Sequence, residues 1–416
     1  MAYKLFSSFS RNFLGALLVG VFGLAGLTQA QMNHSSMTSS ASSKPLICEG
    51  FGLDCANAAT PFLTKDGSLF LAWTSGGKVS VAQSSNLGKT FTSPIVIAEH
   101  GKSLDAGSDA RPQIVSDSKG NIFLAYAFFK DGNWNAQINT ARSSDGGLSF
   151  TTPTPLIKNG SSERFPSMVI GKDDSIFLTW IDKRLVADAK KSGNARLGGS
   201  IAYSFSNDAG KTFQPEKIAN QQSCECCRIG STIDPKGGVA IVYRAIFPGG
   251  IRDHATQLIN EFSAGKVHRV SKDEWRTDAC PHHGPAIAVS SAGKMHVAWF
   301  TQGAARSGVF YANSSNQGET YSNPIRVGGE HENVSRPYLL AQDESIWLVW
   351  KGFDGVKTSV YLKQSADDGV TWSQPSLVAQ TGAYSDHPLL ISNGGDVFLS
   401  WLTRADGYQL IKLGGK

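Results

Sequence analysis

Apolar and polar residues alternate in short runs along most of this chain, with the two-residue period of β-strands. Residues 164–218 show the arrangement clearly, because turn-forming residues such as Lys172-Asp173-Asp174 separate one apolar run from the next. The four runs are 164–170, 175–180, 200–205 and 214–218. No helical period runs through this segment, so we expect four short strands in succession.

This four-strand segment is one copy of a repeat that fills the chain. An aromatic residue ends the second strand, and it recurs at intervals of about 50 to 60 residues. The seven aromatic residues are Trp73, Tyr126, Trp180, Tyr243, Trp299, Trp350 and Trp401. Gly230 opens the preceding strand in the fourth copy, and the other copies have a proline there: Pro61, Pro112, Pro166, Pro285, Pro337 and Pro388. The pattern predicts an all-β fold, a β-propeller of seven four-stranded blades whose innermost strands begin at these positions.

The turn between the third and fourth strands carries an eight-residue motif. One copy reads Ser143-Ser144-Asp145-Gly146-Gly147-Leu148-Ser149-Phe150, and residues 206–213 and 365–372 repeat it. Looser copies, with Asn in place of Asp, occupy 84–91 and 314–321. Such a sequence favours a hairpin turn, because Ser and Asp (or Asn) side chains accept backbone amide hydrogens and glycine tolerates a positive φ. We expect the final aromatic side chain of each octet to lie between sheets.

These octets resemble the Asp-box, Ser-x-Asp-x-Gly-x-Thr-Trp/Phe, of the sialidase-like (BNR-repeat) β-propellers. The resemblance implies a propeller with the octets at its periphery and ligands bound on the face where the inner strands begin. Sialidases hold a sialic-acid carboxylate with three arginines, use a Tyr nucleophile activated by a Glu, and use an Asp as acid and base. The resemblance therefore offers Tyr384 with Glu163, and Asp105, Asp109 or Asp386 as the acid.

The sequence departs from the sialidase pattern in two respects. Sialidases carry a Phe/Tyr-Arg-x-Pro motif on the first inner strand, whereas Asn57-Ala58-Ala59-Thr60-Pro61 has no arginine. The nearest match, Arg164-Phe165-Pro166, lies in the third copy, and sialidases have six blades rather than seven. Because one fold supports many functions, an exo-α-sialidase type of glycoside hydrolase is an alternative here, and whether the protein is an enzyme stays open.

The N-terminal segment has the features of an export signal. Lys4 and Arg11 supply positive charge, residues 14–27 are apolar, and Thr28-Gln29-Ala30 suits cleavage near Ala30. We therefore expect residues 1–30 to be a signal peptide and the protein to be periplasmic or secreted. The apolar run is too short to span a bilayer comfortably, so no membrane span is expected in the mature chain.

After the leader, residues 31–43 are Ser-rich and should form a disordered linker, with the propeller domain at 44–416. Met32, His34 and Met37 in the linker are soft ligands, although the composition favours a plain solvated segment. The seventh copy ends after its third strand. A proline-containing run at 43–47 matches the fourth strands of other copies, so we expect it to complete the last blade and close the ring.

Charge excludes one class of partner. The formal net charge is +5, and it falls to +3 without the two basic residues of the leader. Lys and Arg are scattered rather than clustered, so we expect no nucleic-acid-binding surface. A basic insertion at 183–197 is expected to be a solvated loop.

Residues at the start of each inner strand should converge at one mouth of the central channel. Arginine or histidine occurs there in most copies, and the predicted ligand-binding residues are Arg111, Arg164, Arg228, His283, Arg336 and His387. Guanidinium groups suit a carboxylate or phosphate, so we expect an anionic small molecule, glycan or protein partner. The alternative is that each arginine pairs with a nearby acid: Asp109, Glu163, Glu225 or Glu332.

Two neighbouring copies carry Cys- and His-rich loops directly before their inner strands, so the repeat places both loops on one rim. Disulfides are the simpler interpretation in an exported protein with six cysteines, with Cys48 pairing separately with Cys55. The alternative is a metal or redox site for copper or zinc. Its predicted ligands are Cys224, Cys226, Cys227, Cys280, His282 and His283.

Together these features predict an exported propeller that acts as a binding module for an anionic ligand at an Arg/His-ringed channel mouth. Three alternatives remain at this point: the sialidase-type hydrolase, a periplasmic copper- or zinc-binding or redox protein, and an assembly factor.

Overall fold

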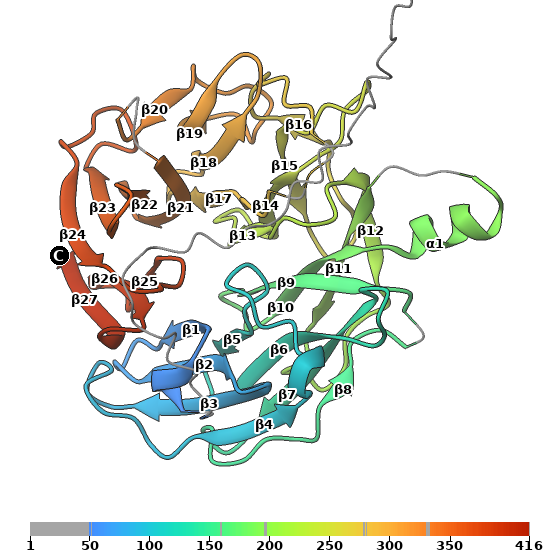
Figure 1. Cartoon of the computed structure of the whole chain (residues 1–416), viewed down its shortest axis with the longest axis vertical. Coiled ribbons are helices and arrows are strands. Elements are labelled where there is room, and N and C mark those ends of the chain that lie inside the picture. Colours follow the sequence, from blue (N-terminus) through green and yellow to red (C-terminus); the bar gives the residue numbers. More distant parts are fainter. Residues whose placement is uncertain are drawn as a thin grey trace, which may run out of the picture. The chain divides into compact units, whose positions relative to one another are not determined.

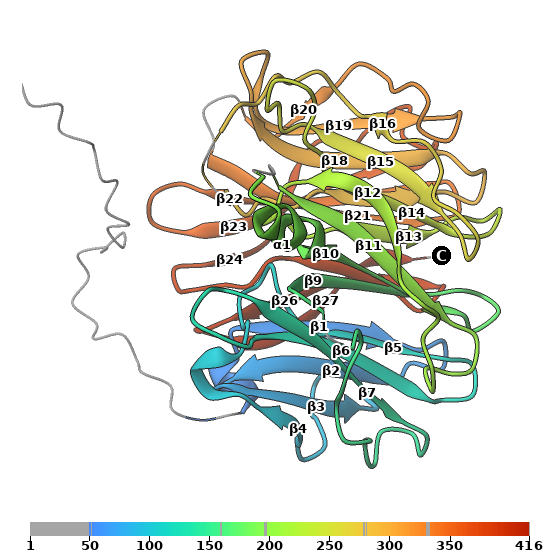
Figure 2. The same ribbon diagram turned by 90° about the vertical axis from the view of Figure 1, so that its right-hand side faces the viewer.

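The repeats form seven antiparallel sheets arranged in a ring (Figure 1). The computed structural model describes residues 50, 52–158, 160–194, 198–277, 279, 281–329 and 333–415. The first strand of each sheet lies beside the first strands of its two neighbours, from β1 through β25 and back to β1. The expected all-β, seven-bladed propeller is confirmed, and a side view shows its strands along their length (Figure 2).

Six sheets have four strands in simple up-and-down order. Blades one to three contain β1 (Ala58–Leu63), β2 (Leu69–Ser75), β3 (Lys78–Ser84), β4 (Ile95–Glu99), β5 (Gln113–Ser116), β6 (Ile122–Phe129), β7 (Ala136–Ser143), β8 (Thr154–Pro155), β9 (Glu163–Ile170), β10 (Ile176–Asp182), β11 (Gly199–Ser206) and β12 (Lys217–Ser223). Blades four to six contain β13 (Gly230–Ile233), β14 (Val239–Arg244), β15 (His254–Ile259), β16 (His268–Arg269), β17 (Ala286–Val289), β18 (Met295–Gln302), β19 (Ser307–Ser314), β20 (Ile325–Val327), β21 (Asn333–Gln342), β22 (Ser345–Phe353), β23 (Thr358–Ser365) and β24 (Ser376–Thr381).

The seventh sheet has three described strands, β25 (Leu389–Ser392), β26 (Asp396–Thr403) and β27 (Gly407–Gly415). The run at 43–47 that should complete it lies outside the described residues, as do the leader and the linker with its Met and His residues. The domain boundaries therefore stay predictions. Cys55 is disulfide-bonded, but its predicted partner Cys48 also lies outside the described residues.

The seven repeat aromatics hold neighbouring blades together. Each is almost fully buried, from 0% to 1% exposed, and each belongs to a different apolar cluster between two adjacent sheets. Trp73 packs between the last and first blades, where Leu402 meets Leu71 and Ala59. The aromatic repeat is therefore the signature of blade-to-blade packing.

The octets form the turns that their sequence predicts. Ser143 donates to Asp145 Oδ1 at 2.7 Å and accepts the Gly147 amide at 2.8 Å, while Asp145 Oδ1 accepts the Ser149 amide at 3.0 Å. Gly147 has φ 89°, which glycine adopts without strain. Phe150 is half-buried against the cluster between blades one and two, as expected for the final aromatic.

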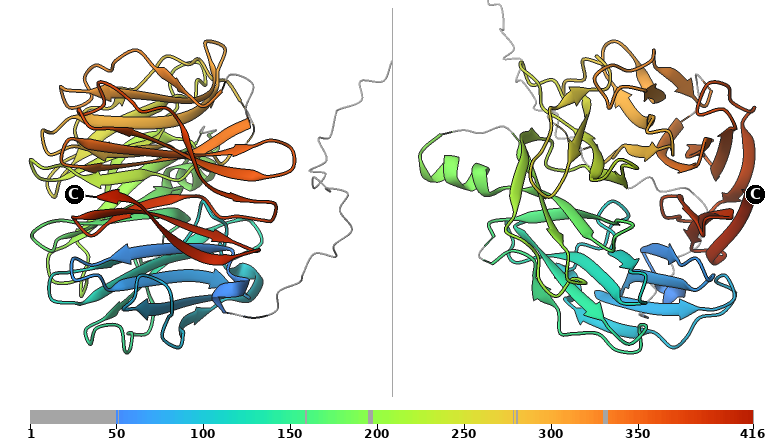
Figure 3. Two further views of the ribbon diagram at one scale, coloured as in Figure 1. Left: turned by 90° about the vertical axis from the view of Figure 1, so that its left-hand side faces the viewer. Right: turned by 180° about the vertical axis from the view of Figure 1, so that it is seen from behind.

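The insertion expected to be a plain loop contains the helix α1 (Arg184–Lys191), which stands outside the ring (Figure 3). Asp182, one residue before the N-cap Lys183, stabilises the start of the helix, because its carboxylate accepts both the backbone amide and the side chain of Arg184, at 2.8 and 2.9 Å. Gly193, with φ 71°, follows its end. The helix is short and has no fully buried residue. No described helix is long and apolar enough to cross a membrane.

Replacing one repeat aromatic tests the packing role. Trp180→Ala, at a fully buried position between blades two and three, should lower the free energy of unfolding by about 3–5 kcal/mol. Trp134→Ala removes a tryptophan that is 66% exposed and should cost at most about 1.5 kcal/mol. Urea denaturation followed by tryptophan fluorescence measures both, and equal losses would contradict the assignment.

Candidate functional site

The inner strands of all seven blades surround a cavity of about 160 Å³ on the ring axis. Every inner strand contributes at least one residue to its lining, among them Thr60, Gln113, Ser167, Ser231, Ala286, Tyr338 and Leu389. Asp109, Arg111 and Arg228 line it as well, from the loops that enter β5 and β13. We call the entrance formed by these loops the channel mouth.

One carboxylate at the channel mouth, that of Asp109, joins three of the predicted site residues. Asp109 belongs to the loop between the short helix η2 (Gly101–Ser103) and β5. Nη1 of Arg336 lies 3.0 Å from both of its oxygens, and Nη1 of Arg228 lies 3.3 Å from Oδ1. His387 Nδ1 lies 3.7 Å from the same oxygen. A side chain from the inner strand of blade six and two from the loops that precede blades four and seven thus meet an acid that precedes blade two.

The other two arginines pair with different aspartates. Arg111 is buried and donates to Asp386 at 2.6 Å and to the Ala59 carbonyl at 2.9 Å, and it thereby joins blades one, two and seven. Arg164 binds Asp105 through Nε and Nη2, at 2.7 and 3.0 Å. Two-point pairing of this kind fixes the orientation of the guanidinium plane.

The acids that neutralise the arginines differ from most of those expected. Asp109 does pair with arginine, but Glu225 instead binds Lys183 at 2.6 Å, and Glu163 pairs with none of the arginines. Glu332 lies outside the described residues. The partners are Asp105, Asp109 and Asp386, which lie two to seven residues before an opening proline. The sialidase resemblance offered all three as acid/base candidates, and only Asp109 was also expected to pair with an arginine.

The channel mouth nevertheless carries more positive than negative charge. Lys351, which the repeat pattern did not predict as a site residue, donates to the Ser385 hydroxyl at 2.9 Å and to the Asp386 carbonyl at 3.2 Å. Burial lowers the pKa of Lys351 to about 8, so it is mostly charged at neutral pH. With the four arginines there are five cations against three carboxylates (Asp105, Asp109 and Asp386), a surplus of two.

The histidines of the channel mouth are uncharged at neutral pH. Burial lowers the pKa of His387 far below its usual value, and Arg336, Arg228 and Arg111 lower it further. Burial, followed by the nearby arginines, lowers the pKa of His283 to about 2. These imidazoles therefore act as neutral hydrogen-bonding or aromatic groups rather than as cations.

Arg336 has an unusual backbone conformation and an unused hydrogen-bond donor. Its φ is 55°, a left-handed value that is rare for a residue with a side chain, and the β21–β22 register shifts between Ser335 and Tyr338. The bulge redirects its side chain out of the sheet. Among the described residues, Arg336 Nη2 has no hydrogen-bond partner, and the side chain is 17% exposed. Strained positions of this kind often mark binding sites.

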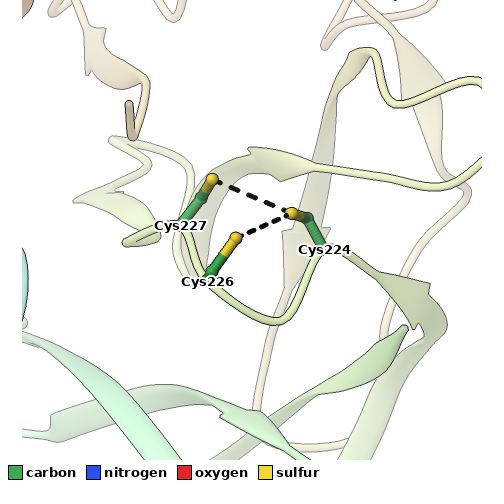
Figure 4. Close-up of side chains that lie close together, drawn as sticks. All are labelled: Cys224, Cys226 and Cys227. Atoms are coloured by element: carbon green, nitrogen blue, oxygen red, sulfur yellow. Dashed lines mark hydrogen bonds between the residues drawn. The ribbon is translucent and has the colours of Figure 1, made fainter. Parts of the chain in front are cut away.

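The two Cys- and His-rich loops are neighbours, as the repeat implied. Arg244 donates to the His283 carbonyl at 3.1 Å, and a Cβ on Gly284 would lie 2.1 Å from Arg228 Cγ, so only glycine fits there. Cys224, Cys226 and Cys227 converge, and their sulfur atoms lie within 4.8 Å of one another (Figure 4).

Of the remaining predicted metal ligands, the two histidines lie apart from the sulfur group. His283 stacks on Phe300, with ring centroids 4.0 Å apart, and His282 packs near Phe165. Neither belongs to the ligand group formed by the described cysteines. Cys280 lies outside the described residues. The three described thiols are free, so the expectation that disulfides engage them is not met here.

The residues offered for sialidase chemistry are not arranged as a nucleophile and its base. The Tyr384 hydroxyl contacts the Ser108 hydroxyl at 3.2 Å and donates to the Asn57 carbonyl at 3.0 Å. Glu163 is 1% exposed, and neither of its oxygens has a hydrogen-bond partner among the described residues. Burial raises the pKa of Glu163 to about 7, so it is protonated in mildly acidic solution.

Solved structures of similar fold include carbohydrate-active enzymes. A PL25 ulvan lyase bound to -[GlcA(1-4)Rha3S]- is 12% identical, with coverage of 87% of this chain and 94% of the lyase, and a TM-score of 0.54. A protein of unknown function from Dyadobacter fermentans is 13% identical, with coverage of 72% and 92% and a TM-score of 0.50. A leech intramolecular trans-sialidase is 10% identical, with coverage of 83% of each chain and a TM-score of 0.47.

No protein-family model matches this sequence, and no curated protein matches it. Identities of this size show a common fold and leave activity open. The propeller expected from the repeat is thus confirmed by comparison as well as by topology.

The protonation of Glu163 has a testable consequence for stability. Its pKa is about 7 in the folded protein, against an ordinary value of 4.5. Between those two pH values, Glu163 is therefore ionised in the unfolded chain but still protonated in the folded protein. Stability should fall as pH rises through this interval and level off above about pH 7.

Glu163→Gln removes this titration, so its urea midpoint should fall less than that of the wild type between pH 5 and pH 8. Glu99→Gln, at a side chain that is 65% exposed, is the matched control and should behave as the wild type. The same pH dependence in Glu163→Gln and the wild type would refute the assignment.

Proposed function

We propose that this protein is an exported binding module that holds an anionic ligand, of carboxylate or glycan type, at the channel mouth. The observation that carries the proposal is the Asp109 carboxylate, which Arg228, Arg336 and His387 contact from three separate blades. These side chains already present their donors to a carboxylate of the protein itself. Export to the periplasm or the exterior is part of the proposal and rests on the leader sequence.

The net positive charge of the channel mouth and its unused hydrogen-bond donors favour the binding of a second carboxylate. The two surplus positive charges favour a ligand anion, and Nη2 of Arg336 and Nη1 of Arg164 have no partner among the described residues. Both side chains are 17% exposed, so they are reachable from solvent and still partly shielded from it. Shielding strengthens a charge-assisted hydrogen bond relative to one on the open surface.

A glycan is in keeping with the ulvan lyase of similar fold, which was solved with -[GlcA(1-4)Rha3S]- bound. An acidic sugar would offer a carboxylate to the arginines and its ring face to aromatic side chains. Phe129 is the aromatic side chain available at this position, because it is half-buried and lies next to Arg164, whose guanidinium is 4.9 Å from the centre of its ring. Phe165, which is 1% exposed, supports Arg164 from below and is not accessible to a ligand.

Calorimetric titration with glucuronate and N-acetylneuraminate tests the proposal, with uncharged N-acetylglucosamine as the reference. We expect the acidic sugars to bind more tightly, and Arg336→Gln to weaken binding at least tenfold, or about 1.4 kcal/mol. Arg326→Gln, at an outer-strand arginine over Phe310, is the matched control and should bind as the wild type. Equal binding of the neutral sugar, or equal affinity in both variants, would overturn the proposal.

A fluorogenic sialoside tests the hydrolase alternative. We expect no turnover by the purified protein, because the Tyr384 hydroxyl contacts Ser108 and Asn57 rather than an acid that could activate it. Turnover that disappears in Arg164→Ala or Arg336→Ala would establish a hydrolase instead.

A further inference from the structure

The three described free cysteines gather in one turn between β12 and β13. The Cys224 amide donates to the Arg244 carbonyl at 2.9 Å, so this turn is fixed to the second strand of blade four. The sulfur of Cys224 lies 3.4 Å from that of Cys226 and 3.9 Å from that of Cys227 (Figure 4). Sulfur atoms bound 2.3 Å from one metal ion lie about 3.8 to 4.0 Å apart. Small side-chain shifts would therefore let one ion contact all three.

These thiols do not fill the apolar core. They are 1%, 4% and 2% exposed, yet they form a cluster of their own, separate from the interblade clusters. Buried thiols used only for packing normally lie among hydrocarbon side chains. A buried group of three sulfurs that contact one another calls for a different explanation.

Two arginines accompany the sulfur cluster. Arg252 Nη1 donates to Cys224 Sγ at 3.7 Å. Arg244 is 0% exposed, and two of its nitrogens, Nε and Nη1, have no hydrogen-bond partner among the described residues. Burying such a cation is costly without negative charge nearby. A thiolate in the adjacent sulfur cluster would supply that charge.

We propose that Cys224, Cys226 and Cys227 form a buried three-thiolate site for one copper(I) ion. Thiolates select soft cations, of which copper(I) and zinc are the usual candidates. Structural zinc takes four ligands, and among the described His, Cys, Asp and Glu residues only these three cysteines form the group. Copper(I) is satisfied by three sulfurs. Binding displaces the remaining thiol protons to solvent, and the two arginines balance the negative charge of the complex.

The first experiment measures copper(I) bound by the reduced full-length protein without oxygen, in competition with bicinchoninate. We expect one tightly bound ion per chain with near-ultraviolet Cu–S absorption, and X-ray absorption should count three sulfur neighbours. Cys226→Ser should lower the affinity at least a hundredfold. Met295→Leu removes a buried sulfur elsewhere and should leave it unchanged.

Three outcomes would overturn the proposal: no copper(I) bound by the reduced wild type, equal binding in Cys226→Ser, or stoichiometric zinc bound in preference to copper(I). Equal binding in Cys226→Ser would mean that copper binds elsewhere, for example at the linker methionines and histidine. Arg252→Gln leaves the ligands intact and should weaken copper(I) binding about tenfold through the lost hydrogen bond to sulfur. A thermal melt of each variant checks that it is folded.

Discussion

The structure depends on the requirement that every sheet be covered on both faces. A blade has an apolar layer on each side, so it is stable only between two neighbours, and the last blade must meet the first. Trp73 is buried at the junction between the last and first blades, where it packs in one apolar cluster with Leu402 of the last blade. In a closed ring, neighbouring blades cover both faces of every sheet, so no helix is needed to cover them. The burial of all seven repeat aromatics agrees with this.

Ring closure is also what creates the channel mouth. Asp109 and Arg336 are 227 residues apart in sequence, and Arg111 and Asp386 are 275 apart, yet both pairs form ion pairs. Buried ion pairs contribute little net stability, because desolvation offsets their attraction. Their effect here is positional: they fix the guanidinium groups in one geometry, and fixed donors bind an anion without losing side-chain entropy.

The sulfur cluster and the channel mouth are joined through neighbouring residues. Cys227 directly precedes Arg228, which binds Asp109, and Arg244 links the sulfur turn to the His283 carbonyl. A change in the turn at Cys224–Cys227 would therefore reach the arginines through a few covalent and hydrogen bonds. The two proposed sites share one side of the ring even though their chemistry differs.

The sequence by itself determined the blade repeat, because turn chemistry and burial of one aromatic per blade are local demands that each copy must meet separately. It also showed which residues precede the inner strands. Tertiary structure alone decided which acid neutralises which arginine, because those partners come from non-adjacent blades that only ring closure gathers around one channel mouth: Asp109 with Arg336, and Asp386 with Arg111. Lys351 went unnoticed because it lies on a second strand, and its place beside Ser385 depends on how blades six and seven pack.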